Sequence, residues 1–350
     1  MKKFTYIEIL RLITSLSVLI YHYIHFFHPY NSFYGQEITF NRTELPFYHV
    51  LNLFYDHGRY GVEMFWAISG FVFAHVYLDQ SKKTSSKEFF INRFARLYPL
   101  HLATLILVSF LQILSVNING AFEIYKINDL YHFFLNLFFV HGWGAADGWS
   151  FNAPTWSVSI ELIIYSIFFG SIYFLNKFNI KFLIFIYLIL LLVDKYWSVK
   201  TFYLTAFFDC SRLFFSGVLI HYIFKKIYKK IYLILLSTIL IFISLIGSLK
   251  IFILFPAIIL LLSSFQSIKN IRINNFFQFS GDLTYSLYLL HIPSQIIIIQ
   301  VFGFFNFNKS LFLSEYFFTI YIIWMLLISS MSFKFFEKPL NKKIRNFFKD

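Results

Sequence analysis

The chain has 350 residues, of which 58% are hydrophobic and only 13% are charged. Apolar stretches of about 20 residues recur along almost its whole length, which predicts an all-α integral membrane bundle and leaves no polar block long enough for a soluble domain. The net charge of +13 does not indicate nucleic-acid binding, because the Lys and Arg residues collect in short loops between apolar runs.

About ten transmembrane helices are predicted in a single membrane domain over residues 1–350, with no appended soluble domain. Their cores are residues 7–27, 60–79, 96–116, 154–175, 182–197, 205–224, 231–248, 251–267, 283–302 and 314–334. The sequence Glu337-Lys338-Pro339 is expected to end the last helix.

Clusters of cations in alternate loops set the predicted orientation. They are Lys2 and Lys3; Lys82, Lys83, Lys87, Arg93 and Arg96; Lys177 and Lys181; Lys225, Lys226, Lys229 and Lys230; Lys269 and Arg272; and Lys338, Lys342, Lys343, Arg345 and Lys349. Placing every cluster in the cytoplasm satisfies the positive-inside rule and puts both termini there. The apolar segment 130–141 is short for a span, and counting it would invert all later loops. We therefore predict that it is interfacial or re-entrant within an outer loop, 117–153.

Arg11 and His22 are the first pair of ionisable residues inside an apolar segment. Eleven residues at about 100° each bring them within roughly 20° on a helix, about 16 Å apart along its axis. Such residues are costly in a bilayer and mark functional sites. In the functional interpretation Arg11 binds a phosphate and His22 is a general base. In the alternative, Arg11 reaches back to the interface and His22 is a hydrogen-bonded core residue.

The second and third apolar segments add two further groups. In the stretch 61–71, the glycines indicate close helix packing, while Glu63 is a carboxylate at the entrance of a span. Arg93 and Arg96 lie three residues apart at an expected helix start before Pro99. Their two guanidinium groups form a phosphate clamp or, alternatively, serve as ordinary cytoplasmic charges.

Two later segments carry polar residues at helical spacing. Ser157 and Glu161 are four residues apart and share a face, and a carboxylate this far into a span needs a partner on a neighbouring helix. Thr284, Tyr288 and His291 form one stripe, and His291 lies mid-span shortly before Pro293.

In this order, these elements resemble the acyltransferase-3 family of integral-membrane O-acyltransferases over essentially the whole chain. The matching elements are the Arg11-to-His22 spacing, Gly61…Phe65…Ser69-Gly70-Phe71, Arg93-x-x-Arg96-x-x-Pro99, Trp156-Ser157…Glu161, Tyr285-Ser286-Leu287-Tyr288…His291 and Glu337-x-Pro339.

The resemblance implies that an acyl group, usually acetyl, passes from cytoplasmic acyl-CoA to a hydroxyl of a glycan or another surface molecule. It implies that His22 is catalytic and that Arg11, Arg93 and Arg96 contribute to donor binding or activity. The expected location is a bacterial plasma membrane. Acyl-CoA is expected as a substrate, with no permanently bound cofactor. The single cysteine, Cys210, excludes an intrachain disulfide and argues against a zinc site.

The chemistry suggests roles for the remaining residues. His22 would take the proton of the acceptor hydroxyl, and Glu161 would orient its imidazole. Ser69 or Tyr288 is a candidate donor to the oxyanion. The expected supporting pocket comprises Ser69, Trp156, Ser157, Tyr288, His291 and Glu63. A route through an acyl-histidine stays open.

The competing interpretation is a proton-coupled transporter or flippase of a polysaccharide precursor, since intramembrane His, Arg and Glu also serve transport. A transporter does not need the Arg93 and Arg96 clamp beside a buried histidine. We therefore favour the acyltransferase.

Overall fold

The protein is all-helical in the part of the chain that the computed structural model describes. This part comprises residues 4–27, 41–78, 84–178, 180–196, 201–247, 250–265, 268 and 270–348. Several positions of the topology prediction lie outside it: Lys2, Lys3, residue 79, Lys82, Lys83, residues 197, 248 and 267, Lys269 and Lys349.

The chain forms two compact units. The first comprises Met1–Thr14, Tyr60–Ser86 and Ile160–Gly281, and the second comprises Ser15–Arg59, Lys87–Ser159 and Asp282–Asp350. The helices α1 (Thr5–Tyr21) and α6 (Trp156–Phe178) are divided between the two units, and α4 (Ser86–Asn119) and α11 (Ile271–Asp282) each extend one residue across the boundary.

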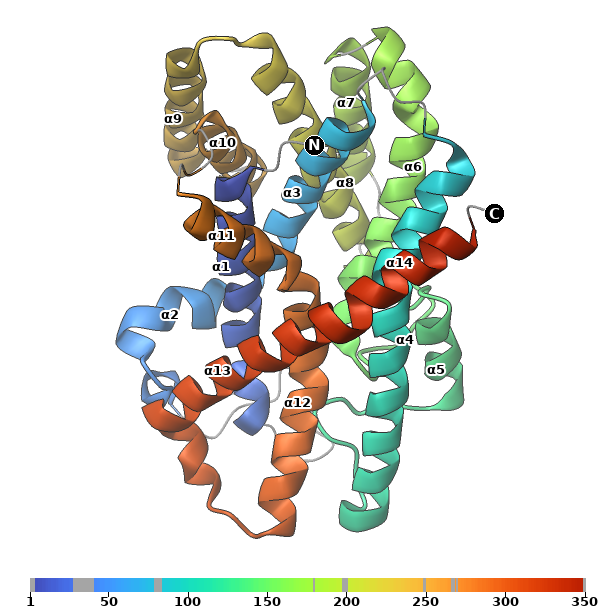
Figure 1. Cartoon of the computed structure of the whole chain (residues 1–350), viewed down its shortest axis with the longest axis vertical. Coiled ribbons are helices and arrows are strands. Elements are labelled where there is room, and N and C mark those ends of the chain that lie inside the picture. Colours follow the sequence, from blue (N-terminus) through green and yellow to red (C-terminus); the bar gives the residue numbers. More distant parts are fainter. Residues whose placement is uncertain are drawn as a thin grey trace. The chain divides into compact units, whose positions relative to one another are not determined.

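The first unit is built around α8 (Phe202–Lys226). This helix packs against α3 (Tyr60–Tyr77), α7 (Ile180–Tyr196) and α10 (Lys250–Ser264), and α10 packs in turn against α9 (Lys230–Ile246), its neighbour in Figure 1. All five helices coincide with predicted spans.

One helix of this unit, α11 (Ile271–Asp282), was predicted as part of a loop. Asn270 explains its start, because its side-chain oxygen accepts hydrogen bonds from the backbone N–H groups of Arg272 and Ile273 at 3.0 and 3.3 Å. This is an N-cap, which stabilises a first helical turn.

Two glycines allow α3 and α8 to touch along their backbones. A Cβ atom on Gly70 would lie 1.8 Å from the carbonyl oxygen of Phe214, and one on Gly217 would lie 2.1 Å from that of Ala67. Any larger residue would push the two helices apart. The packing role predicted for the glycines of the 61–71 stretch is therefore confirmed at Gly70.

We expect Gly70→Ala to destabilise the protein by about 1–3 kcal/mol, the usual cost of overpacking. The matched control is Gly170→Ala on α6, where an added Cβ meets no atom within 4 Å. This change should be neutral or slightly stabilising, since alanine favours a helix over glycine. Thermal unfolding of the purified variants measures both, and equal effects would contradict the close contact at Gly70.

The second unit contains three long helices: α4 (Ser86–Asn119), α12 (Thr284–Phe304) and α13 (Glu315–Ser332). A 3-10 segment, His22–Phe27, continues α1 and packs against α12. Aromatic residues hold it in place: the Tyr23 ring contacts the rings of Phe26, Phe318 and Tyr321, and its hydroxyl donates to the carbonyl of Phe312 at 2.7 Å.

The helix that carries Arg93 and Arg96 begins earlier than predicted, at Ser86 rather than near residue 96. Glu88 in its first turn complements the helix dipole, and Pro99 is accommodated inside the helix. The two arginines therefore lie within a helix and not at its start.

The prediction that the last helix ends at Glu337-Lys338-Pro339 was wrong. A π-helical segment, Phe333–Glu337, joins α13 to α14 (Lys338–Phe347), and Figure 1 shows α13 and α14 as one long run. Pro339 lies in the first turn of α14, where its missing N–H costs little.

Among the residues that the structure describes, six helical stretches are long and apolar enough to cross a membrane. They are Thr5–Phe27, Ser86–Asn119, Ala153–Phe178, Phe202–Lys226, Thr284–Phe304 and Glu315–Phe347, and three shorter apolar helices accompany them. The second predicted span coincides with α3, which contains Glu63 and His75 and is not among the six. The chain is thus a multi-pass helical membrane protein. The total of about ten spans and the cytoplasmic termini stay predictions.

The predicted outer loop contains α5 (Leu130–Leu137), whose eight residues extend about 12 Å and cannot cross a bilayer. Segment 130–141 is therefore not a span, and its interfacial or re-entrant position in an outer loop stays a prediction. Before α5, the side-chain amide of Gln112 exchanges two 2.9 Å hydrogen bonds with the backbone of Glu123. The Glu123 side chain is buried, and Ser115 donates to its carboxylate at 3.2 Å.

Burial raises the pKa of Glu123 from 4.5 to about 7. In the unfolded chain this carboxyl ionises near pH 4.5, whereas the folded protein keeps it protonated up to about pH 7. The protonated Glu123 side chain therefore makes its full contribution to the free energy of unfolding below pH 4.5. Between pH 4.5 and about pH 7 this contribution, about 3 kcal/mol, is lost.

We expect Glu123→Gln to abolish this loss, since the amide does not ionise. Thermal unfolding between pH 5 and 8 measures the effect, with Glu88→Gln as the exposed control. A Glu123→Gln protein that loses stability with pH as steeply as the wild type would contradict the assignment.

Candidate active site

His22 lies where α1 changes from an α-helix to a 3-10 helix, at the end of α1 opposite the N-terminus of the chain. We had predicted one α-helix over 7–27. The side chain of Gln295 on α12 donates to the backbone carbonyl of His22 at 2.8 Å. In a continuing α-helix, this carbonyl would accept a hydrogen bond from a backbone N–H of the same helix. Here the Gln295 side chain is the donor instead, and 3-10 turns are common at helix ends. The backbone at His22 is thus fixed from outside its own helix.

The imidazole of His22 is paired with that of His291. The Nδ1 atom of His22 lies 3.1 Å from Nε2 of His291, and the two rings are nearly parallel, 16° apart. His291 is buried whereas His22 is half-buried, so His22 is the more accessible of the two. The sequence analysis placed His291 in the pocket but did not foresee this direct contact.

The contact also couples the protonation of the two rings. Nε2 of His291 faces Nδ1 of His22, so one of these two nitrogens donates and the other accepts. When His291 carries its proton on Nδ1, its Nε2 accepts from Nδ1 of His22, and Nε2 of the neutral His22 ring is then the basic nitrogen.

A third histidine completes the stack. The rings of His22 and His25 lie 5.0 Å apart at 23°, and Nδ1 of His25 is 3.2 Å from the side-chain oxygen of Gln295. Gln295 therefore joins His25 to the backbone of His22. Within the described ranges, no three His, Cys, Asp or Glu side chains are arranged to hold a metal ion.

Two predicted pocket residues meet at the start of α6. The Tyr288 hydroxyl donates to the carbonyl of Pro154 at 2.5 Å and lies 2.8 Å from Oγ of Ser157. Oγ of Ser157 also lies 3.2 Å from the same Pro154 carbonyl, so the two hydroxyls share this acceptor and are hydrogen-bonded to each other. Trp156 precedes Ser157 in the sequence, and the centre of its ring lies 6.0 Å from that of Trp149. Tyr288 thus ties α12 to the turn before α6, one helical turn from His291.

Arg96 is held by an ion pair with Glu337, at 3.1 Å. It also donates to the carbonyl of Asp282 at 3.2 Å, and its guanidinium lies 5.6 Å from the Tyr285 ring centre. Glu337 is 4% exposed and accepts a second hydrogen bond from Ser286. Arg93, half-buried, is one turn earlier on the same face of α4.

A comparison with protein families decides which class of enzyme these helices form. The family model described as an acyltransferase domain, that of acyltransferase-3, matches residues 4–333. The chain belongs to the acyltransferase-3 family. Comparisons with curated proteins and with solved structures give no match.

Other residues predicted for this acyltransferase belong to the first unit. Arg11 forms an ion pair with Glu8 at 2.9 Å, and the hydroxyl of Tyr165 donates to Glu161 one turn away on α6. Glu63 is in the first turn of α3 and Ser69 directly precedes Gly70. The pairing of Glu161 with His22 and the roles of the other three residues stay predictions.

Two residues of this acyltransferase, Gln295 and His25, were not among those predicted from the sequence. Both were detectable, since Gln295 continues the stripe of Tyr288 and His291 by one further turn, and His25 follows His22 by three residues. The ion pair between Arg96 and Glu337 joins two of the recognised motifs across a long stretch of sequence, and no local signal predicts it.

Proposed function

We propose that this acyltransferase transfers an acyl group, most commonly acetyl, from cytoplasmic acyl-CoA to a hydroxyl of a cell-surface or secreted polysaccharide. It would act in a bacterial plasma membrane, with the acceptor entering from the outer side. The observation that carries the proposal is the pairing of His22, the more accessible ring, with His291, and we assign the tautomer in which His22 donates from Nδ1 and its Nε2 is basic.

The proposed reaction begins at Nε2 of His22, which accepts the proton of the acceptor hydroxyl. The acceptor oxygen then attacks the thioester carbonyl and forms a tetrahedral intermediate. Its collapse breaks the carbon–sulfur bond, releases the O-acyl product and returns the proton from His22 to the sulfur of CoA. His291 keeps its hydrogen bond to Nδ1 of His22 throughout and so holds the ring in one orientation.

For the donor, Arg93 and Arg96 supply guanidinium groups suited to phosphates. Arg96 already forms an ion pair with Glu337, which fixes its position but partly neutralises its positive charge. We therefore assign the larger share of phosphate binding to Arg93. Arg11 and Glu161 are proposed to contribute as the sequence analysis predicts, with Arg11 toward the donor and Glu161 toward His22.

The test uses purified protein in lipid nanodiscs with radiolabelled acetyl-CoA and a crude surface-glycan fraction. Wild type should bind the donor, release CoA and label the glycan. Arg93→Ala should weaken donor binding about tenfold, the cost of one charge-assisted contact. Lys87→Ala, which removes an exposed cation from the same helix, is the control and should bind normally. Wild-type protein that binds no acyl-CoA would overturn the proposal and favour a transporter.

A further inference from the structure

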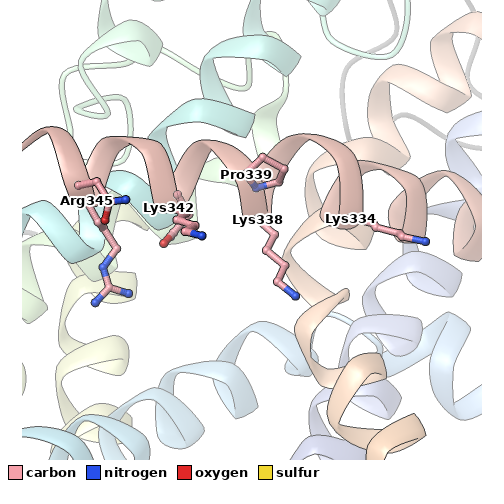
Figure 2. Close-up of a pocket in the computed structure, with 7 residues that line it drawn as sticks. Lys334, Lys338, Pro339, Lys342 and Arg345 are labelled. Carbon is pink, nitrogen blue, oxygen red and sulfur yellow. The ribbon is translucent and has the colours of Figure 1, made fainter.

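The last helix, α14, and the π-helical segment before it present a row of cations along one side. Lys338, Lys342 and Arg345 are spaced by four and three residues on one face of α14, and Lys334 precedes them in the π-helical segment. Figure 2 shows these four side chains along the same side of the helix. With Asn341 and Asn346 they line an open pocket of about 620 Å³.

No acidic residue is among those that line this pocket. Glu337, the acid nearest in sequence, is buried and bound to Arg96. Positive charge therefore accumulates along the pocket without an internal counter-charge, and two asparagine side chains add hydrogen-bonding groups. Phosphate-bearing ligands fit this chemistry.

The roughly opposite face of α14 is apolar. Leu340, Ile344 and Phe347 follow the same spacing, and Leu340 and Ile344 are half-buried while Phe347 is 76% exposed. A helix with Lys and Arg on one face and Phe and Leu on the other is the type that lies in a membrane interface. A soluble phosphate compound would satisfy the cations but leave the apolar face in water.

The position of α14 fits the same surface. The helical stretch Glu315–Phe347 has 33 residues and extends about 50 Å, which is longer than the roughly 30 Å hydrocarbon core. The cations are at its C-terminal end, directly after the last apolar span. Basic clusters in this position are attracted to anionic lipids of the cytoplasmic leaflet.

We infer that the cationic face of α14 is a binding site for the phosphate headgroups of anionic phospholipids. Its occupant is the inner-leaflet membrane surface, which contacts the cations with its headgroups and the apolar face with its acyl chains. This site is separate from the proposed acyl-transfer site and does not depend on it.

Phosphatidylglycerol titrated into the full-length protein in neutral detergent tests this, with binding followed by native mass spectrometry and phosphatidylcholine as the uncharged comparison. Each cation near an anionic surface contributes about fivefold in affinity, so Lys338→Gln/Lys342→Gln/Arg345→Gln should weaken phosphatidylglycerol binding by about a hundredfold. The matched control Lys225→Gln/Lys226→Gln/Lys229→Gln loses the same charge elsewhere and should change binding little.

A second variant, Asn341→Glu, places a carboxylate inside the pocket while keeping every cation. It should also weaken phosphatidylglycerol binding, and it keeps the test valid if the triple variant fails to fold. Equal losses in both triple variants would show that only net charge matters and would overturn the site. Loss of bound phosphatidylglycerol on adding equimolar CoA would also overturn the site, because it would assign the cationic face to soluble phosphates. Equal binding of phosphatidylglycerol and phosphatidylcholine would overturn it as well.

Discussion

Replacing His22 with alanine should lower the rate of acyl transfer by about a thousandfold while leaving acyl-CoA binding within about twofold of wild type. The loss lies within the usual range for removing a general base. Binding should persist because the arginines proposed to bind most of the phosphate charge, Arg93 and Arg96, are on α4, and His22 is proposed to act only in the chemical step. Single-turnover transfer of labelled acetyl, measured beside equilibrium binding, separates the two effects. His49→Ala, an exposed histidine on α2 (Tyr48–His57), is the control and should transfer normally.

Two variants of His291 test whether this residue positions the His22 ring or only packs against it. His291→Gln keeps an acceptor for Nδ1–H of His22 and should retain most activity, whereas His291→Leu removes that acceptor and should lower kcat about tenfold or more. The pH profile of kcat/KM should also change shape in His291→Leu, because the protonated form of His22 loses its partner. A variant that only loosened packing would lower the rate equally at every pH, and this result would contradict the positioning role.

The second large effect is expected at the ion pair between Arg96 and Glu337. Glu337→Ala leaves the Arg96 guanidinium and the Ser286 hydroxyl without their shared acceptor in a mostly buried place, and breaking such a pair costs about 3–5 kcal/mol. Arg96 is 25% exposed, so the lower end of that range applies. Thermal unfolding measures the loss, and Glu337→Gln, which keeps a hydrogen-bond acceptor, should lose less.

A double-mutant cycle separates the structural part of Arg96 from its proposed part in donor binding. Arg96→Ala/Glu337→Ala should be more stable than the sum of the single changes predicts, since no charge is then left buried alone. If Arg96 also binds the donor, acyl-CoA affinity stays low in this double variant although stability recovers. Recovery of both stability and acyl-CoA affinity would show that the role of Arg96 is only to hold α4 against the last helix.

The sequence predicted most of the helices because apolar length is a direct consequence of the bilayer. Spans such as α8 and α12 were located to within a few residues. The errors occurred where tertiary contacts or caps override local signals. Asn270 starts α11 inside an expected loop, and the helix of Arg93 and Arg96 begins at Ser86 although Pro99 suggested a later start.

The candidate site was predicted in its residue types but not in its contacts. The stripe of Tyr288 and His291 followed from helical spacing. Helical spacing could not predict the partner of His22. Contacts between distant helices depend on how those helices pack, and the spacing along one helix does not report that packing. The structure brings His291 into hydrogen-bonding distance of His22, and the expected pairing of Glu161 with His22 stays a prediction.

The π-helical segment Phe333–Glu337 gives the final helix one place where the chain can lose a residue without turning. A π turn contains one residue more than an α turn, so deleting one residue there would restore regular α geometry and leave the phase of α14 nearly unchanged. Deleting one residue within the regular part of α13 would instead rotate everything beyond it by about 100° and retract it by about 1.5 Å. Loss of a single codon in α13 would therefore turn the row of cations away from its present direction, whereas the same loss in the π segment would not.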